Sequence, residues 1–299
     1  MPSPLTFEPI SAAIGATVRG IDLNRADDAD YQALYDALMK YSVLVFRNQK
    51  LTPKAHVALA ESFGPLRPRH PFFPSVAGYD PIAIIADSEA SPPENEIWHA
   101  DMTADPVPPF GSVLHIQTVP PVGGDTLWCS MHAVHDALSP EMQRFLATLT
   151  AAHDTEYAYR DALANNKGDD RVGVLRRTEK GEGNRRSHPV CMPHPSTGRP
   201  VVYLNAAFTM HIEGLSKRES DSILDMVQRL VNTPRFQMRL KWEPDTVAIF
   251  DNFATQHHAI GDHYPNRRVM HRVTIAGDRR LNTSPFQATR MFSSASPRT

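Results

Sequence analysis

Two strand signals joined by a turn occur in FQMRLKWEPDTVAIF, residues 236–250. In the first part apolar and polar residues alternate, so that Phe236, Met238, Leu240 and Trp242 share one face of the expected strand. The run TVAIF at the end is apolar, which is typical of a buried strand. The Glu-Pro-Asp between the two runs indicates a turn. This stretch therefore predicts β structure that buries at least one face.

Short strand signals separated by turns continue through much of the chain beyond about residue 80, and helix signals are fewer. A doubly wound parallel sheet would need regular alternation of strands and helices, and the sequence lacks this alternation. It also lacks the glycine-rich motifs that bind dinucleotides or phosphates. The pattern therefore favours a mainly β fold with flanking helices, either an antiparallel sandwich or a jelly roll. Further strands are expected at 41–49, 81–87, 111–119, 122–130 and 267–278, and a strand that leads into a loop is expected at 198–208. Helices are expected at 30–40, at 51–66 between Thr52 and Gly64, at 139–149, and after Ser216, which forms a capping-box pattern with Glu219.

One domain is expected over residues 1–280, with a lid or surface insertion at about 155–190. The centre of this insertion, 164–186, is polar, charged and glycine-bearing, which also suits a loop without a function. Residues 281–299 are rich in Ser, Thr and Pro, and we expect an irregular tail there.

Composition excludes several functional classes. The net charge of −2 gives no basic excess for nucleic-acid binding. Only two cysteines are present, which favours a reducing compartment over a disulfide scaffold. We identify no signal peptide and no apolar run of about 18 residues that could cross a membrane. A cytoplasmic protein is therefore expected.

The strongest chemical signal is WHAD, residues 98–101. On an extended segment His99 and Asp101 point the same way and can reach one metal ion. His257 and His258 are candidates for a third ligand, but neighbours on a strand face opposite sides, and residue patterns alone do not choose between them. Two histidines and one carboxylate are typical of non-haem Fe(II) oxygenases. The same set also suits a zinc hydrolase, and a metal-free binding jelly roll is a third possibility.

The last expected strand carries Arg268 and Arg272 on one face. Exposed arginines would form an ordinary solvated surface. If this face points inward, each arginine needs a buried anion, because an unpaired buried charge is unstable. Arginine holds carboxylates and sulfonates through paired hydrogen bonds. The strand therefore predicts two anion sites if its arginines are buried.

Five motifs in order resemble the TauD/TfdA family of 2-oxoglutarate-dependent non-haem iron dioxygenases. They are WHAD at 98–101, GGDTLW at 123–128, WEPDTVAIFDN at 242–252, TQH at 255–257 and RRVMHRVTI at 267–275. Weaker similarity begins near GIDL at 20–23 and includes SVLVFRNQ and ESFGPL, so the resemblance extends over nearly the whole chain to Gly277. The resemblance implies a double-stranded β-helix, or jelly roll.

The resemblance also implies roles for individual residues. His99, Asp101 and His257 match the iron ligands, which selects His257 over His258. Thr126 and Arg268 match the residues that hold the distal carboxylate of 2-oxoglutarate, and Arg272 matches the arginine that binds the substrate's anionic group. In members that act on taurine, further matches are His70 to a sulfonate ligand, Asn95 to a residue near the amine, and Met102 and Phe208 to apolar pocket positions.

One position departs from the taurine-specific pattern. Those members have a tyrosine three residues after the position of His70, and this chain has Phe73. The missing hydroxyl removes a polar partner for the amine. Sites built on such groups discriminate strongly between substrates that make the hydrogen bond and substrates that do not.

The implied activity is hydroxylation of a small anionic substrate with Fe(II), 2-oxoglutarate and O₂. Taurine or a related sulfonate is the leading substrate, with release of sulfite, an aldehyde, succinate and CO₂. Alkyl sulfates and aryloxyalkanoates are the alternatives. Family members are commonly dimers or tetramers, so a homo-oligomer is expected.

Overall fold

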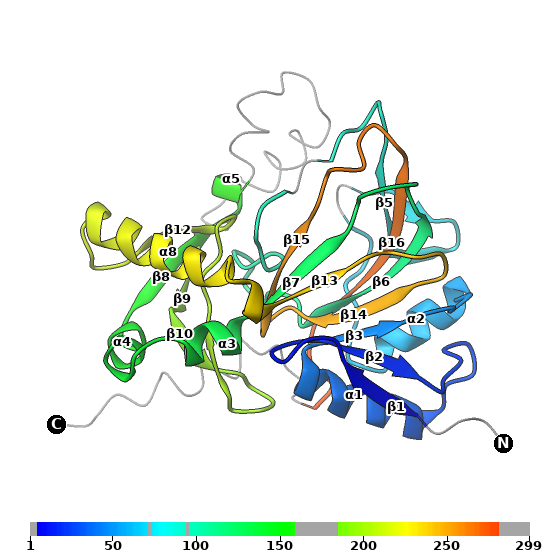
Figure 1. Cartoon of the computed structure of the whole chain (residues 1–299), viewed down its shortest axis with the longest axis horizontal. Helices are drawn as coiled ribbons and strands as arrows, with labels where there is room; N and C mark the ends of the chain where they lie inside the picture. The colour runs from blue at the N-terminus through cyan, green and yellow to red at the C-terminus, as the bar shows by residue number, and fades with distance from the viewer. Residues whose placement is uncertain (1–4, 71–72, 94–95, 159–184, 281–299) are drawn as a thin grey trace.

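A computed structural model describes residues 5–70, 73–93, 96–158 and 185–280 (Figure 1). The central part of the predicted insertion, 159–184, and the predicted tail, 281–299, lie outside the described residues. Within the described part, none of the helices is both long and apolar enough to cross a membrane.

The larger layer of the fold is an eight-stranded sheet in the order β1-β2-β3-β14-β6-β16-β5-β4. Its neighbouring strands are antiparallel except for β2 and β3. Two helices, α1 (Asp28–Tyr41) and α2 (Pro53–Glu61), cover the outer face (Figure 1). Leu38, Leu59 and Ile249 belong to the core that this packing buries. The strands are β1 (Thr6–Pro9), β2 (Ala16–Arg19), β3 (Val43–Phe46), β4 (Ser75–Val76), β5 (Tyr79–Asp87), β6 (Gly111–Thr118), β14 (Val247–Asp251) and β16 (Arg268–Ile275).

A smaller antiparallel sheet, in the order β13-β7-β15, packs against the inner face of the large one. Its strands are β13 (Gln237–Leu240), β7 (Thr126–Ser130) and β15 (Thr255–Ala259). Trp128 and Leu240 from this sheet share a core with Phe250 and Met270 from the large sheet. The two facing sheets form the predicted jelly roll, and its inner core supports one wall of the site described below.

A third group of elements packs beside the smaller sheet (Figure 1). The longest is α8 (Lys217–Val231), which begins after Ser216, and both hydrogen bonds of the predicted capping box with Glu219 are present. Two small sheets, β12-β8-β9 and β10-β11, complete this region. The other elements are α3 (Met131–Asp136), α4 (Pro140–Leu146), β8 (Thr150–Asp154), α5 (Thr155–Ala158), β9 (Arg185–Pro189), β10 (Cys191–Pro193), β11 (Pro200–Val202), β12 (Thr209–Ile212) and the 3-10 turn η1 (Pro234–Phe236).

Three details of the predicted elements were wrong. Helix α4 ends at Leu146 rather than at Leu149. Phe236 lies in η1 and packs with the core around α8, so it does not share the inner face of β13 with Met238 and Leu240. Helix α2 ends at Glu61 rather than near Gly64. Gly64 is required for another reason: a Cβ there would lie 1.8 Å from the carbonyl oxygen of Gly277.

Candidate metal centre

The backbone brings His99 and His257 side by side. The His99 N–H donates to the His257 carbonyl over 3.0 Å, and the His257 N–H donates to the His99 carbonyl over 2.8 Å. This reciprocal pair attaches the WHAD segment to β15 as a short antiparallel bridge. The two imidazole rings consequently lie with their centroids 4.1 Å apart.

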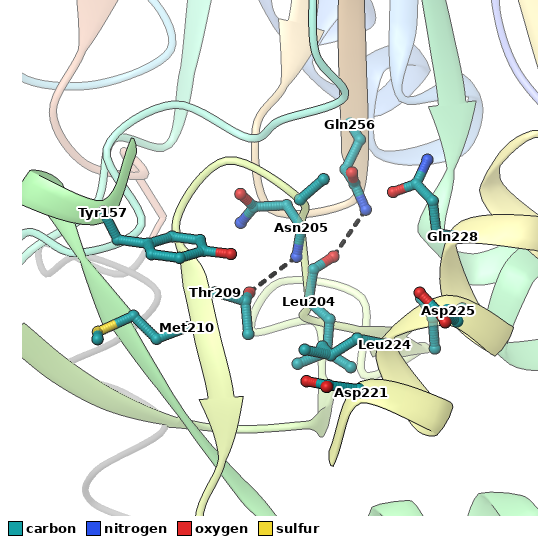
Figure 2. A pocket seen from close by; sticks show the side chains of 12 residues that line it. Tyr157, Leu204, Asn205, Thr209, Met210, Asp221, Leu224, Asp225, Gln228 and Gln256 are labelled. Atoms are coloured by element: carbon teal, nitrogen blue, oxygen red, sulfur yellow. Dashed lines mark hydrogen bonds between the residues drawn. The ribbon is translucent and has the colours of Figure 1, made fainter. Parts of the chain in front are cut away.

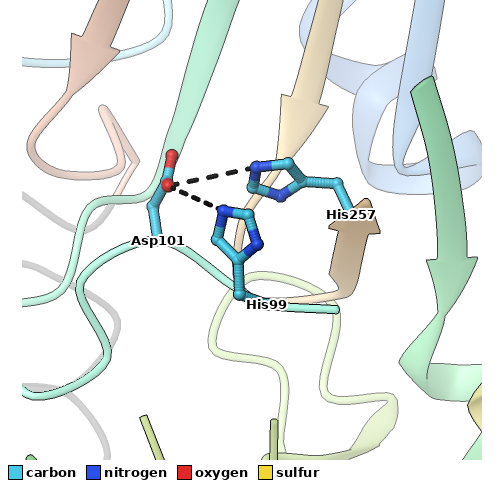
Figure 3. Close-up of side chains that lie close together, drawn as sticks. All are labelled: His99, Asp101 and His257. Carbon is cyan, nitrogen blue, oxygen red and sulfur yellow. Dashed lines mark ion pairs between the residues drawn. The ribbon is translucent and has the colours of Figure 1, made fainter. Parts of the chain in front are cut away.

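Asp101 completes a cluster of three potential metal ligands (Figure 3). Its Oδ1 lies 3.7 Å from His99 Nε2 and 4.0 Å from His257 Nε2. Bonds from imidazole nitrogen or carboxylate oxygen to a divalent metal are about 2.1 Å long, so two ligands of one ion lie up to about 4.2 Å apart. Both distances satisfy this limit, and the two-histidine, one-carboxylate donor set fits Fe(II).

Both histidine rings are neutral, as ligands of a metal ion must be. His99 Nδ1 lies 2.8 Å from the Ile97 carbonyl, which requires Nδ1 to carry the proton and leaves the Nε2 lone pair directed at the cluster. Burial lowers the pKa of His99, and burial together with the neighbouring His99 ring lowers the pKa of His257 to about 3. Both rings are therefore unprotonated near neutral pH.

Asp101 is held as an anion. Burial alone would raise its pKa, but Arg272 and the nearby histidines outweigh burial and lower the pKa to about 2. Arg272 Nη1 lies 3.4 Å from Oδ2, the oxygen that does not face the histidines. One carboxylate oxygen is thus directed at the metal cluster and the other at the guanidinium of Arg272.

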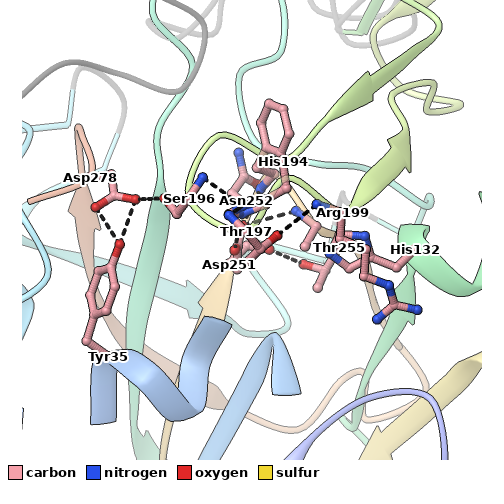
Figure 4. A network of polar contacts seen from close by, with 12 residues as sticks. Tyr35, His132, His194, Ser196, Thr197, Arg199, Asp251, Asn252, Thr255 and Asp278 are labelled. Carbon is pink, nitrogen blue, oxygen red and sulfur yellow. Dashed lines mark hydrogen bonds and ion pairs between the residues drawn. The ribbon is translucent and has the colours of Figure 1, made fainter. Parts of the chain in front are cut away.

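Asn252 holds the backbone of the metal loop. Its Oδ1 accepts from the Asp101 N–H over 2.7 Å, and its Nδ2 donates to the carbonyls of Asp101 and Pro109 over 3.0 and 3.1 Å. The preceding residue, Asp251, is buried and receives a 2.8 Å hydrogen bond from His194 Nε2 (Figure 4). The residue that follows β14 therefore holds the backbone of Asp101 in place.

A second cationic site is formed by the inward face of β16. Arg268 is buried and its Nη2 lies 3.5 Å from Thr126 Oγ1, which also accepts from Trp242 Nε1 over 3.0 Å. Asp87 lies 3.8 Å from Arg268 Nη1. Within the described part of the chain, Arg268 Nε has no hydrogen-bond partner. Burial lowers the pKa of Arg268, whereas Asp87 and Asp125 favour its charged form.

Two of the predicted substrate residues, His70 and Phe73, lie near Arg272. The ring of Phe73 lies 4.6 Å from the ring of His70, centroid to centroid, and 5.7 Å from Arg272 Cζ. Burial, followed by the Arg272 charge, lowers the pKa of His70 to about 3, so this ring is neutral. Met102 packs against the cluster that contains Phe208. Asn95 lies outside the described residues.

Sequence patterns did not identify the roles of Asn252, Trp242 and Asp87 around these side chains. Asn252 and Trp242 stand within a motif that carries the family resemblance, but their contacts depend on loops that fold back from distant parts of the chain. Asp87 could have been suspected from its position at the end of an apolar strand. His258, the rejected alternative ligand, lies beside Trp98 with 5.5 Å between ring centroids.

Comparisons with known proteins give a consistent picture. The family model described as taurine catabolism dioxygenase TauD, TfdA family matches residues 6–274. The chain is 31% identical over 277 residues to an alkylsulfatase from Acinetobacter baylyi, covering 92% of this chain and 86% of that protein. It is 30% identical over 273 residues to an (S)-phenoxypropionate/alpha-ketoglutarate-dioxygenase from Sphingobium herbicidovorans, covering 90% and 94%. A taurine dioxygenase from Burkholderia xenovorans superimposes with a TM-score of 0.77 at 32% identity, covering 92% of this chain and 90% of that one.

Proposed function

This chain belongs to the TauD, TfdA family of dioxygenases, and we propose that its metal centre serves to hydroxylate a small organic sulfonate or sulfate ester. The family uses Fe(II) and 2-oxoglutarate, and the chain is therefore a 2-oxoglutarate-dependent dioxygenase. This assignment decides against the zinc hydrolase and the metal-free binding protein that the residue patterns alone left possible.

The observation that carries the substrate proposal is the partly buried guanidinium of Arg272 beside the metal cluster. Its side chain is only 14% exposed, and its Nη1 contacts Asp101 Oδ2. Arg272 Nε has no hydrogen-bond partner among those residues. A largely desolvated cation with unpaired donors favours an anionic ligand, and the planar guanidinium suits the oxygens of a sulfonate or sulfate group.

Each group of residues has a distinct task in the proposed reaction. His99, Asp101 and His257 would hold Fe(II), which when bound activates O₂ so that oxidative decarboxylation of 2-oxoglutarate drives oxygen insertion into a C–H bond. Arg268 and Thr126 would hold the distal carboxylate of 2-oxoglutarate.

Arg272 would fix the anionic end of the substrate, and Phe73, Met102 and Phe208 would exclude water around its carbon chain.

The products follow from the position of hydroxylation. Oxidation of the carbon that bears a sulfonate gives an unstable hydroxysulfonate, which separates into an aldehyde and sulfite. The same step on a sulfate ester gives an aldehyde and sulfate. In both cases 2-oxoglutarate becomes succinate and CO₂.

The side chains around Arg272 favour an anionic substrate with an apolar chain over taurine, which carries an ammonium group. Phe73 presents an aromatic ring where a tyrosine hydroxyl could bind an amine, and the neighbouring His70 ring is neutral. The ammonium group of taurine would lose hydration next to the positive charge of Arg272. We therefore place alkanesulfonates and alkyl sulfates ahead of taurine, and phenoxypropionates remain the alternative class.

A succinate-release screen tests this proposal. The purified protein with Fe(II) and 2-oxoglutarate is supplied with an alkanesulfonate, taurine, an alkyl sulfate or a phenoxypropionate. We expect succinate together with sulfite or sulfate, and Arg272→Ala should raise the KM for the organic anion about 100-fold, in line with the loss of a buried charge pair. Stimulation by phenoxypropionate alone would contradict the proposed substrate class. The expected homo-oligomer stays a prediction, and light scattering of the purified protein would test it.

A further inference from the structure

Met102 has a strained backbone conformation directly beside the metal cluster. Its φ of 50° lies in the left-handed region, which residues other than glycine rarely adopt. Met102 follows Asp101 in the chain, and its side chain packs against the cluster that contains Phe208. A conformation of this kind persists only where neighbouring groups hold it. The groups that hold Met102 therefore also control the position of Asp101.

The jelly roll holds the amino-terminal side of Met102. Asn252 binds both backbone groups of Asp101, accepting from its N–H over 2.7 Å and donating to its carbonyl over 3.0 Å. The Met102 carbonyl itself accepts from the Asp105 N–H over 3.0 Å, which closes a turn. The backbone at Met102 is thus fixed on one side by a residue that follows β14.

Thr103, on the other side of Met102, is held by three side chains from another part of the fold. It is fully buried, and its carbonyl accepts from His188 Nε2 over 2.8 Å. Its Oγ1 lies 2.9 Å from His153 Nδ1 and accepts from Asn205 Nδ2 over 3.1 Å. These three residues belong to β9, to β8 and to the connection between β11 and β12, respectively. Thr103 therefore attaches the metal loop to the third group of elements.

Asn205 extends this network to the turn that carries Phe208. Its Oδ1 accepts from the Phe208 N–H over 2.9 Å, so Nδ2 is the end of the amide that faces Thr103. The Asn205 N–H donates to Thr209 Oγ1 over 2.9 Å (Figure 2). The Thr209 N–H donates back to the Asn205 carbonyl over 3.1 Å, which closes the turn. One amide therefore holds both Thr103 and the backbone of Phe208.

The hydrogen bonds of Thr103 are suited to a buried site. Burial, followed by the neighbouring His188, lowers the pKa of His153 well below its usual value, so the His153 ring is neutral. A neutral imidazole pairs with a hydroxyl without leaving an uncompensated charge in the interior. Because a carbonyl only accepts, His188 Nε2 carries a proton. The carbonyl and the hydroxyl of Thr103 are thus both paired, as buried polar groups require.

We propose that Thr103 is a positioning residue for the metal centre and acts through the left-handed backbone at Met102. Asn252 fixes the residue before Met102 and the network around Thr103 fixes the residue after it, so the strained residue between them stays in place. The Asp101 carboxylate is thereby kept directed at the two histidines of the metal cluster. This inference rests on the proposed use of Asp101 as a metal ligand.

Replacing Thr103 with valine tests the proposal, because valine keeps the shape of the side chain and lacks the hydroxyl. We expect the affinity for Fe(II), measured by anaerobic calorimetry, to fall about tenfold, as for other residues that orient a metal ligand. Thr103→Ser keeps the hydroxyl and should bind Fe(II) like the unmodified protein. If Thr103→Val does not fold, His153→Phe makes the same test, since it removes one hydrogen bond and leaves an aromatic ring in place.

A second substitution distinguishes positioning from a general loss of stability. Glycine adopts a positive φ without steric cost, so the left-handed conformation no longer has to be enforced when Met102 is replaced by glycine. Met102→Gly combined with Thr103→Val should therefore restore most of the lost Fe(II) affinity. Met102→Ala removes the same side-chain contacts but keeps the Cβ, and in the same background it should restore none.

Thr246→Val is the matched control. Thr246 is also fully buried, its Oγ1 accepts from Arg47 Nη1 over 2.9 Å, and it precedes β14 at the end opposite Asn252. Its replacement should lower stability in urea unfolding and leave Fe(II) affinity unchanged.

Three results would overturn the proposal. They are Fe(II) binding by Thr103→Val as tight as that of the unmodified protein, an equal loss of Fe(II) affinity in Thr246→Val, and equal effects of Met102→Gly and Met102→Ala in the Thr103→Val background. Failure of the unmodified protein to bind Fe(II) would instead refute the metal centre itself, and this inference with it.

Discussion

Replacing Asn252 with alanine should loosen the metal loop without removing any metal ligand. The side chain of Asn252 makes three hydrogen bonds to backbone groups of Asp101 and Pro109, and the residue is 1% exposed. Each buried hydrogen bond contributes about 1 kcal/mol, so their loss should reduce the free energy of unfolding by about 3 kcal/mol. Because Asp101 would no longer be held in place, Fe(II) affinity should fall about 10- to 100-fold, as for other residues that orient a ligand.

Gln49→Ala provides the matched control. Gln49 is also buried, and its side chain makes the same kinds of bond, accepting from the Leu23 N–H and donating to the carbonyls of Ile21 and Arg47. Its removal should reduce stability to a similar extent and leave Fe(II) affinity unchanged. Urea unfolding followed by circular dichroism measures the stability, and anaerobic calorimetry measures the Fe(II) affinity. If both variants bind Fe(II) as tightly as the unmodified protein, Asn252 has no positioning role and the reasoning is refuted.

Three further changes have defined outcomes. Arg268→Ala should weaken binding of the co-substrate 2-oxoglutarate and raise its KM about 100-fold, because a buried charged contact is lost, while the KM for the organic anion should change little in succinate-release assays. Phe73→Tyr should raise kcat/KM for taurine relative to propanesulfonate about tenfold, the worth of one added hydrogen bond in a buried site. His56→Gln should flatten the acid side of the stability curve. Burial lowers the pKa of His56 to about 3, so the folded state resists protonation and stability is lost as pH falls from about 6.5 towards 3, by about 1.4 kcal/mol per pH unit. Urea unfolding at several pH values should show that the free energy of unfolding of the variant depends less steeply on pH, by about 1.4 kcal/mol per pH unit.

Each of these expectations has a contrary result. Equal effects of Arg268→Ala on both KM values would argue against a site reserved for 2-oxoglutarate. An unchanged preference after Phe73→Tyr would mean that the hydroxyl does not reach the amine. Parallel pH profiles for the unmodified protein and His56→Gln would show that this histidine does not contribute to acid sensitivity.

Local patterns predicted most of the elements that form the jelly roll. Alternation places Met238 and Leu240 on the inner face of β13, and the capping box fixes the start of α8 at Lys217. The same alternation failed at Phe236, because Pro234, two residues earlier, begins a 3-10 turn and the Phe236 side chain packs into another core. Period-two patterns hold only where the backbone is extended, and the sequence does not mark where extension begins.

The candidate site was predictable only where its residues are close together in the sequence. His99 and Asp101 are two residues apart, so local geometry already placed them together. The choice of His257 over His258 required the family resemblance, because it depends on a bridge between backbones that are far apart in the chain. The role of Asn252 depends on the 101–109 loop folding back over the end of β14, a long-range contact that no residue pattern records.

The charge-transfer absorption of anaerobic Fe(II) with 2-oxoglutarate tests the central claim most directly. A visible band should form with the unmodified protein and with His258→Ala, and it should be absent with His257→Ala. Formation of the band in His257→Ala, with its loss in His258→Ala, would contradict the assignment of His99, Asp101 and His257 as the iron ligands.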